Sequence, residues 1–447
     1  MKKTNLQGLL LNWSEDLSRK SKVDEELINK LQPKMGLNEL SIIGYNGTRS
    51  PFWMAKNYCS NLITISFLGC PNWEQLPPLG HLPFLENLVL VDMSSIKRID
   101  HSFYGERNGP HFQSLKDLKF KNMKKWEEWD EIDYLQPFPQ LKYLTIQCCP
   151  GLKSIPTLPF ALTELCIEDV GIVKFPEFYE GTIGNVRDPV SSLPSSSLSQ
   201  LPPLVVSKKQ HELSLKKIRI TNCTNLEQMS LDFFRNLRVV ESMDIMKCPR
   251  LLTDETGDGL LPETLVVLNI GSCGTLDVLL LCSLFHLNSL MILVLEGCAN
   301  ITSLPGREVF SQLKSLDIVA IGDCMNLVSL GGIDAIKSLN NLPASLEELH
   351  ICGCDHTMKM QLHNSLSKNL HILYEEDIEI IEEECGDQLL HRQKNKISNE
   401  DEESNDTEDE DTSDEEEDGE NGETSASYLD DSSLMLTSSS SSASVSM

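Results

Sequence analysis

The 447-residue chain lacks the common signatures of enzymes and membrane proteins. It has no G-x-x-x-x-G-K-[ST] phosphate loop, no G-x-S-x-G nucleophile motif and no H-E-x-x-H zinc motif, so these catalytic classes are excluded. The longest apolar stretch, at residues 276–287, is interrupted by Asp277 and His286 and falls short of the roughly 20 residues that span a bilayer. The apolar run at residues 9–11 is too short for a signal-peptide core. We therefore expect no enzymatic activity, no cofactor and no membrane span.

Basic residues are scarce: the chain has 38 Lys and Arg against 67 Asp and Glu, for a formal net charge of −29. Most of that charge is local, because residues 375–447 hold 26 acidic and 3 basic groups. The remainder is only mildly acidic and shows no basic footprint, so no nucleic-acid partner is expected. The composition of residues 375–447 is too polar and too charged to offset the entropy of ordering, which predicts an acidic, Ser-rich disordered tail.

The 14 cysteines follow a repeat rather than a disulfide framework. Five phrases fit L-x-x-L-x-L-x-x-C with apolar residues at the Leu positions: LKKIRITNC, VESMDIMKC, LVVLNIGSC, LMILVLEGC and LDIVAIGDC. Their last residues are Cys223, Cys248, Cys273, Cys298 and Cys324, which stand 25, 25, 25 and 26 residues apart. A period of roughly 20–29 residues with this template predicts leucine-rich repeats. Cysteines in such positions are expected to be reduced, which favours an intracellular location, cytoplasmic or also nuclear.

The same pattern extends over most of the chain, and its interruptions predict four regions. We expect a first repeat block at 1–179, a Ser/Pro-rich flexible insert at 180–210, a second block at 211–374 and the tail at 375–447. The first strand unit has no polar cap before it, so the array is expected to continue upstream. A short helix is predicted from Asp24 to Leu31, ended by Pro33.

The predicted fold class is α/β: a leucine-rich-repeat solenoid with a curved parallel β-sheet on its concave face and an irregular or short-helical convex side. Side chains alternate along a strand, so the fourth and sixth repeat positions point inward and the third, fifth and seventh point to the opposite face. The ninth-position cysteine lies at the bend after each strand, where a small residue can contact local backbone groups. Its role is therefore expected to be structural.

The outward positions yield a candidate protein-binding surface. In the early repeats these positions are polar, whereas in the later repeats apolar residues occupy neighbouring strands, and a patch of that kind often marks a partner site. The candidate residues are Val267, Asn269, Ile292, Val294, Ile318, Ala320, Tyr143 and Lys119. Cover by the tail or by a missing domain, or an error in register, would explain the apolar residues equally. Trp126, Trp129 and Tyr134 form an aromatic cluster that fits either an interface or the core of a loop.

One group of metal-ligand residue types stands out, in the H-x-C-x-C-x-H sequence of His350, Cys352, Cys354 and His356. The first two occupy the fifth and seventh positions of a repeat, and Cys354 occupies the ninth. The bend would separate their directions, so no metal site is expected.

Several phrases are more specific than the repeat itself: GYNGTRSPFW, FLGCPN, LPPLGHLPFL and SFYG in the first block, and CPGLKSIP, CTNLEQM and CANITSLP later. In these phrases the chain resembles the repeat region of plant nucleotide-binding leucine-rich-repeat disease resistance proteins of the coiled-coil class, over about residues 5–373. The resemblance implies a recognition module for a pathogen effector or a guarded host protein, which also contacts and regulates the nucleotide-binding domain of the receptor. No position matches the family's nucleotide-binding switch, so no nucleotide cofactor is implied. The alternatives are a leucine-rich-repeat substrate receptor of a ubiquitin ligase and, without a supporting motif, a repeat-containing enzyme subunit.

Overall fold

The strands of the repeats belong to one of the two units of the chain, residues 1–373 with 441–447. The computed structural model describes residues 6–13, 20–33, 36–55, 59–105, 111–132, 137–179, 213–227, 229, 233–234, 236–251, 261–329, 342–343, 345–354, 371–374 and 442–446. The insert at 180–210 and the tail at 375–440 lie outside the described residues.

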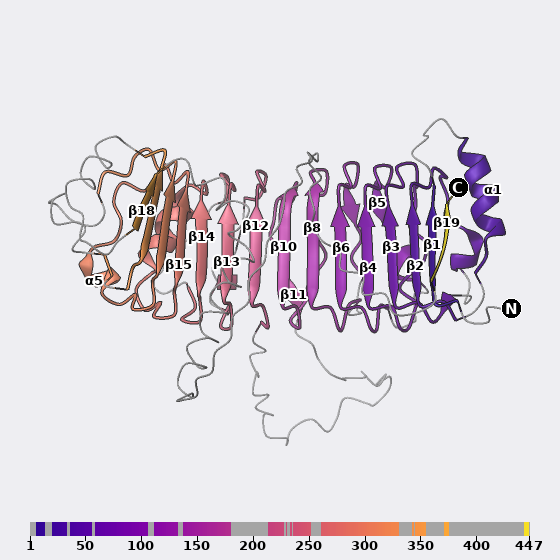
Figure 1. The fold of residues 1–447 in the computed structure, drawn as a ribbon, viewed down its shortest axis with the longest axis horizontal. Coiled ribbons are helices and arrows are strands. Elements are labelled where there is room, and N and C mark those ends of the chain that lie inside the picture. Colours follow the sequence, from indigo (N-terminus) through magenta and orange to yellow (C-terminus); the bar gives the residue numbers. More distant parts are fainter. Residues whose placement is uncertain are drawn as a thin grey trace, which may run out of the picture. The chain divides into compact units, whose positions relative to one another are not determined.

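A single 15-stranded sheet runs through this unit (Figure 1), and the pairings between its strands are parallel. Its strands, in chain order, are β1 (Gly8–Asn12), β2 (Glu39–Ile43), β3 (Thr64–Leu68), β4 (Asn87–Val91), β6 (Asp117–Lys121), β8 (Tyr143–Cys149), β10 (Glu164–Val170), β12 (Lys217–Thr221), β13 (Ser242–Met246), β14 (Val267–Gly271), β15 (Ile292–Glu296), β16 (Ile318–Gly322), β17 (Glu348–Cys352), β18 (His371–Tyr374) and β19 (Ser442–Ser446). Neighbouring strands follow one another in the sequence, except that β19 pairs with β1 at the edge. The predicted solenoid fold is confirmed.

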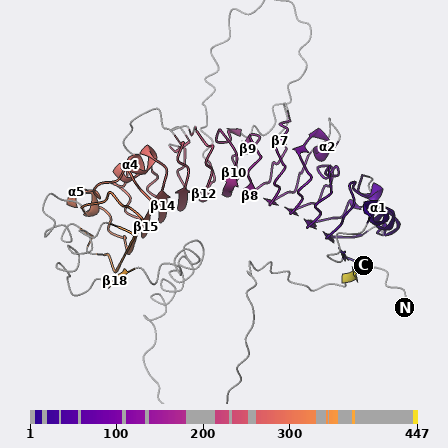
Figure 2. The ribbon, with the colours of Figure 1, turned by 90° about the horizontal axis from the view of Figure 1, so that it is seen from above.

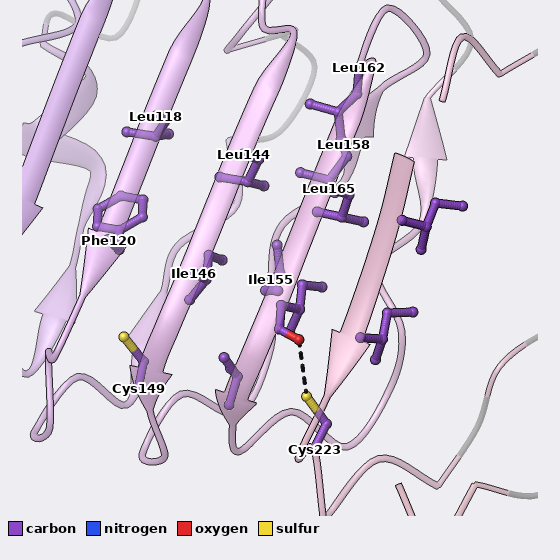
Figure 3. Packing of buried hydrophobic residues seen from close by; sticks show 14 of the residues in the cluster. Leu118, Phe120, Leu144, Ile146, Cys149, Ile155, Leu158, Leu162, Leu165 and Cys223 are labelled. Atoms are coloured by element: carbon purple, nitrogen blue, oxygen red, sulfur yellow. Dashed lines mark hydrogen bonds between the residues drawn. The ribbon is translucent and has the colours of Figure 1, made fainter. Parts of the chain in front are cut away.

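Strand residues alternate between core and surface, as the repeat template requires. On β8 the inward residues Leu144 and Ile146 are buried, and on β10 so are Leu165 and Ile167. Their side chains point to the same side of the sheet and stack strand upon strand (Figure 3). Each repeat therefore completes the apolar core of its neighbours, and this shared burial is the main stabilising contribution in such an array.

The bend after each strand explains the ninth-position cysteine. The residue before the cysteine has a positive φ, 54° at Asn222 for example, which turns the chain out of the sheet. The Cys223 thiol then lies 3.5 Å from the carbonyl oxygen of Thr221 in its own strand and 3.8 Å from that of Ile167 in the preceding repeat (Figure 3). Cys248 and Cys273 make the equivalent pairs of contacts. The cysteines of the described residues are free, and those at the bends have the predicted structural environment.

The return segments carry the helices, on the side of the repeat unit opposite the strands (Figure 2). They are α1 (Ser21–Lys30), the 3-10 helix η1 (Phe52–Ala55), α2 (His101–Tyr104), α4 (Thr275–Cys282) and α5 (Arg307–Phe310). Two further pairs of short strands join adjacent return segments: β5 (Arg98–Ile99) with β7 (Glu128–Trp129), and β9 (Leu158–Pro159) with β11 (Phe178–Tyr179). The predicted helix from Asp24 to Leu31 corresponds to α1, which begins three residues earlier.

The sheet crosses the predicted insert without a break, because β10 pairs directly with β12. The two predicted repeat blocks therefore share one sheet. The second predicted block ends at residue 374, which is also the last residue of β18. At the other end, Gly8 to Asn12 pair in register with Ser442 to Ser446 of β19, a strand that the prediction of a tail at 375–447 did not include.

Asp277 makes the stability of the second block dependent on pH. Its carboxylate, buried in the first turn of α4, accepts a hydrogen bond from the Cys273 amide at 3.1 Å, and burial raises its pKa to about 6. Because the folded state holds this proton more tightly than the unfolded chain, the stabilisation is full below pH 4 and is lost as the pH rises through 6, by up to about 3 kcal/mol.

We expect Asp277→Asn to reduce the loss of stability between pH 5 and pH 7.5, measured by urea unfolding at both values. The exposed carboxylate variant Glu263→Gln is the control and should keep the wild-type difference. Equal pH differences in wild type and Asp277→Asn would contradict this assignment.

Candidate protein-binding surface

The outward side chains of the sheet form three rows, because neighbouring strands pair in register. We call these side chains of β1 to β17 the strand face. The third-position row includes Asp117, Tyr143, Glu164, Lys217, Ser242, Val267, Ile292 and Ile318; the fifth-position row includes Lys119, Thr145, Cys166, Arg219, Asp244, Asn269, Val294 and Ala320. Every residue of the predicted surface is on this face, as the alternation rule requires.

The strand face over β2 to β10 is mostly polar and partly exposed, although Ile43, Leu68, Val89 and Val91 also lie on it. Tyr143 is 40% exposed, and Lys119 on the neighbouring strand is half-buried. Nearby, the Asn87 amide donates to Thr64 Oγ1 at 3.3 Å, and Gln147 donates to a Glu168 carboxylate oxygen at 2.7 Å. Asp117 on β6 and Glu164 on β10 lie in register with Tyr143. An exposed aromatic ring among polar and charged side chains is a surface that suits protein contact.

The apolar residues of the predicted surface are less exposed than the sequence predicted. Val267 and Ile292 are only 4% and 3% exposed, and Asn269, Ile318 and Ala320 are also buried. An error in register is not the reason, because the strands pair as the repeats predict.

The alternation rule does not predict how much of an outward side chain is exposed to solvent. Alternation fixes the side of the sheet on which a residue lies and leaves open what covers it. Outward apolar side chains on strands roughly 4.8 Å apart cover one another in part. Of the apolar candidates, only Val294 keeps an intermediate exposure.

A charged pair on the strand face was not among the predicted residues. Arg219 on β12 donates from Nε to Asp244 Oδ2 on β13 at 3.0 Å. Burial raises the pKa of Asp244 to about 6, while Arg219 opposes that rise. Both residues occupy the fifth position of their repeats, so charge at that position in LKKIRITNC and VESMDIMKC was the available signal.

The metal-ligand residue types near the end of the array do not form a site within the described part of the chain. His350 is buried and its Nε2 lies 2.9 Å from Glu348 Oε2, while Cys354 is buried at the bend. His356 lies outside the described residues. Among the residues described, no three His, Cys, Asp or Glu side chains are placed to hold a metal ion.

The aromatic cluster belongs to the core. Trp126 and Trp129 are buried, with ring centroids 5.4 Å apart, and the Trp129 indole nitrogen donates to the Tyr104 hydroxyl at 2.8 Å. Tyr134 lies outside the described residues. Of the two interpretations left open by the sequence, loop-core packing is therefore confirmed for the two tryptophans.

The parallel sheet, the cysteine-marked bends and the variable strand face define the chain as a leucine-rich-repeat protein. In the described part of the chain, none of the helices has the length and the apolar character needed to cross a membrane. Residues 1–93 match the model of the R13L1/DRL21 leucine-rich repeats.

Three relatives named for disease resistance are similar to about half of the chain. RGA1 of Solanum bulbocastanum is 29% identical over 238 residues, which cover 53% of this chain and 22% of the relative. RPP13-like protein 1 of Arabidopsis thaliana is 28% identical over 246 residues, 51% of this chain and 23% of the relative. RGA4 of Solanum bulbocastanum is 31% identical over 231 residues, 50% of this chain and 21% of the relative. The alignments thus span about a fifth of each relative.

Among solved structures, the leucine-rich repeat domain of the type III effector XCV3220 (XopL) is 14% identical, with a TM-score of 0.24 and coverage of 75% of this chain and 73% of that one. So low a score supports no argument about this chain. The sequence similarities show that the chain carries a leucine-rich-repeat region related to those of plant disease resistance proteins.

Proposed function

We propose that the chain is the protein-recognition module of a plant intracellular immune receptor. It binds a pathogen effector or a guarded host protein through the strand face, contacts the nucleotide-binding domain that it regulates, acts in the cytoplasm and catalyses no reaction. The observation that carries this proposal is the continuous strand face, whose outward residues vary from repeat to repeat while the inward residues stay apolar. A surface of this kind allows recognition to change without a change in the core.

The polar half of the strand face is where contact is expected first. Tyr143 offers an exposed ring that loses little conformational entropy on binding. On the neighbouring strand Asp117 is in register with Tyr143, and Lys119 is its diagonal neighbour. Aromatic residues of this kind are enriched among the side chains that dominate binding energy.

We expect a photoreactive benzoyl-phenylalanine at position 143 to cross-link to a protein partner from pathogen-challenged plant cells. The matched control is the same group at position 285, because Phe285 is comparably exposed, at 36% against 40% for Tyr143, and follows α4 on the opposite side of the repeat unit (Figure 2). Lys119→Glu should weaken the adduct at position 143 at least fivefold. Equal adducts at both positions, or an adduct at position 285 alone, would contradict the proposal. A ubiquitin-ligase adaptor as the captured protein would favour the alternative class.

A further inference from the structure

Two hydrogen-bond acceptors lie side by side on the strand face without a donor. Asp244 on β13 and Asn269 on β14 face each other in register. Asp244 Oδ1 and Asn269 Oδ1 are both buried and have no hydrogen-bond partner, although Asp244 Oδ2 accepts from Arg219. Asn269 is 9% exposed, so solvent does not readily replace the missing donor.

An unsatisfied pair of this kind is uncommon in a folded protein. More than about 90% of buried polar groups are hydrogen-bonded, and each one left without a partner costs about 1–3 kcal/mol. Paired positions on neighbouring parallel strands are roughly 4.8 Å apart. A single group with several N–H donors, such as an ammonium or a guanidinium, can therefore reach both oxygens.

The surrounding charge favours a cation over a neutral donor. Glu168 and Glu296 both act on Asp244 with the same sign of charge. The nearby cations are already engaged: Arg219 pairs with Asp244 itself, and Lys247 lies 3.1 Å from Glu296. The three carboxylates of Asp244, Glu168 and Glu296 thus outnumber the two cations, Arg219 and Lys247. The excess negative charge attracts a cationic donor, and hydrogen bonds with an ionised partner are about twice as strong as those between neutral groups.

Of the two acceptor residues, Asp244 is the more accessible from solvent, and only a small part of its side chain is exposed. The Asp244 side chain keeps 15% of its surface exposed, and Val294 on β15, which is in register with Asn269, presents partly exposed apolar surface beside the acceptors. A slender side chain with an apolar stem and a charged head fits both features, since lysine and arginine lay their methylene stems along apolar surface.

We propose that Asp244 and Asn269 together bind the charged head of a lysine or arginine side chain in an extended segment of the partner protein. The head donates to the two unpaired acceptors, and the stem lies along Val294. This inference rests on the proposed function, because it assigns a chemical class to the partner of the same strand face.

The test uses linear peptides displayed on phage and selected on the full chain. We expect the enriched peptides to share a lysine or arginine, and replacing it with glutamine in a synthetic peptide should weaken binding at least tenfold. Asp244→Asn and Asn269→Leu in the protein should each weaken binding about tenfold, and the affinity should fall with added salt. Glu86→Gln, which removes an exposed carboxylate paired with Lys116, is the matched control and should leave the affinity unchanged. Thermal unfolding of each variant checks that it is folded.

Any of three results would overturn the inference. The first is enrichment of peptides without a shared basic residue, and the second is enrichment of peptides whose binding both variants leave intact. The third is an absence of enrichment over an unrelated immobilised protein. If selected peptides lack a basic residue but lose binding in Lys119→Glu, the strand face remains the partner surface and only the cation site is removed.

Discussion

Leu144→Asp is expected to unfold the middle of the array, whereas Tyr143→Asp at the adjacent position leaves it folded. Leu144 is buried on β8, in register with Leu118 on β6 and Leu165 on β10 (Figure 3). A carboxylate there loses its hydration without gaining a partner, and the loss of the leucine adds a cavity, so we expect a cost above about 4 kcal/mol. In a repeat array this cost also removes the interfaces with both neighbouring repeats.

Tyr143 is a close control, because it directly precedes Leu144 and its side chain lies on the other side of the sheet. Its side chain is 40% exposed, so Tyr143→Asp should cost less than about 1 kcal/mol. Circular dichroism during urea unfolding compares the two. Equal losses of stability, or a larger loss in Tyr143→Asp, would show that the register of β8 is wrong.

Trp126→Ala is expected to lower the free energy of unfolding by about 3–5 kcal/mol. The indole is fully buried, its ring centroid lies 4.7 Å from that of Phe120, and its nitrogen donates to the Glu128 carbonyl at 2.9 Å. The substitution therefore leaves a large cavity and an unpaired carbonyl group. Trp126→Phe should recover more than half of the loss, because it refills most of the cavity without restoring the hydrogen bond.

Phe285→Ala provides the comparison for an aromatic residue in a return segment that is partly exposed. We expect it to cost less than about 1 kcal/mol in the same urea titration. If Trp126→Ala costs no more than Phe285→Ala, the tryptophan cluster belongs to the surface, and the interface interpretation of its sequence applies.

The repeat template predicted strand positions well because one physical requirement repeats in every unit. Inward residues such as Leu144 and Ile146 must be apolar, so the L-x-x-L-x-L spacing fixes which residues pair. The short strand pairs of the return segments, such as β5 with β7, were not predictable from spacing. A strand of two residues is too short to show a period, and Arg98 is held beside Glu128 and Asp130 by ion pairs between adjacent repeats.

The sequence predicted on which side of the sheet the candidate residues lie, but not how exposed their side chains are. Tyr143 and Lys119 lie outward and accessible as predicted, whereas Val267 and Ile292 lie outward and buried. Exposure depends on neighbours from other parts of the chain, which a single repeat does not encode. Asp244 was missed for a related reason, because its unpaired oxygen is visible only when β13 and β14 are placed side by side.

Hydroxyl-radical footprinting of the partner complex cross-linked through position 119 tests the central claim, recognition through the strand face, most directly. Tyrosine and phenylalanine side chains both react with the radical, and Tyr143 and Phe285 are comparably exposed. Tyr143 belongs to β8 and Phe285 follows α4, and these two elements lie on opposite sides of the repeat unit (Figure 2). The account predicts that the partner protects Tyr143 at least threefold and leaves Phe285 unchanged. Protection of Phe285 with full oxidation of Tyr143 would contradict it.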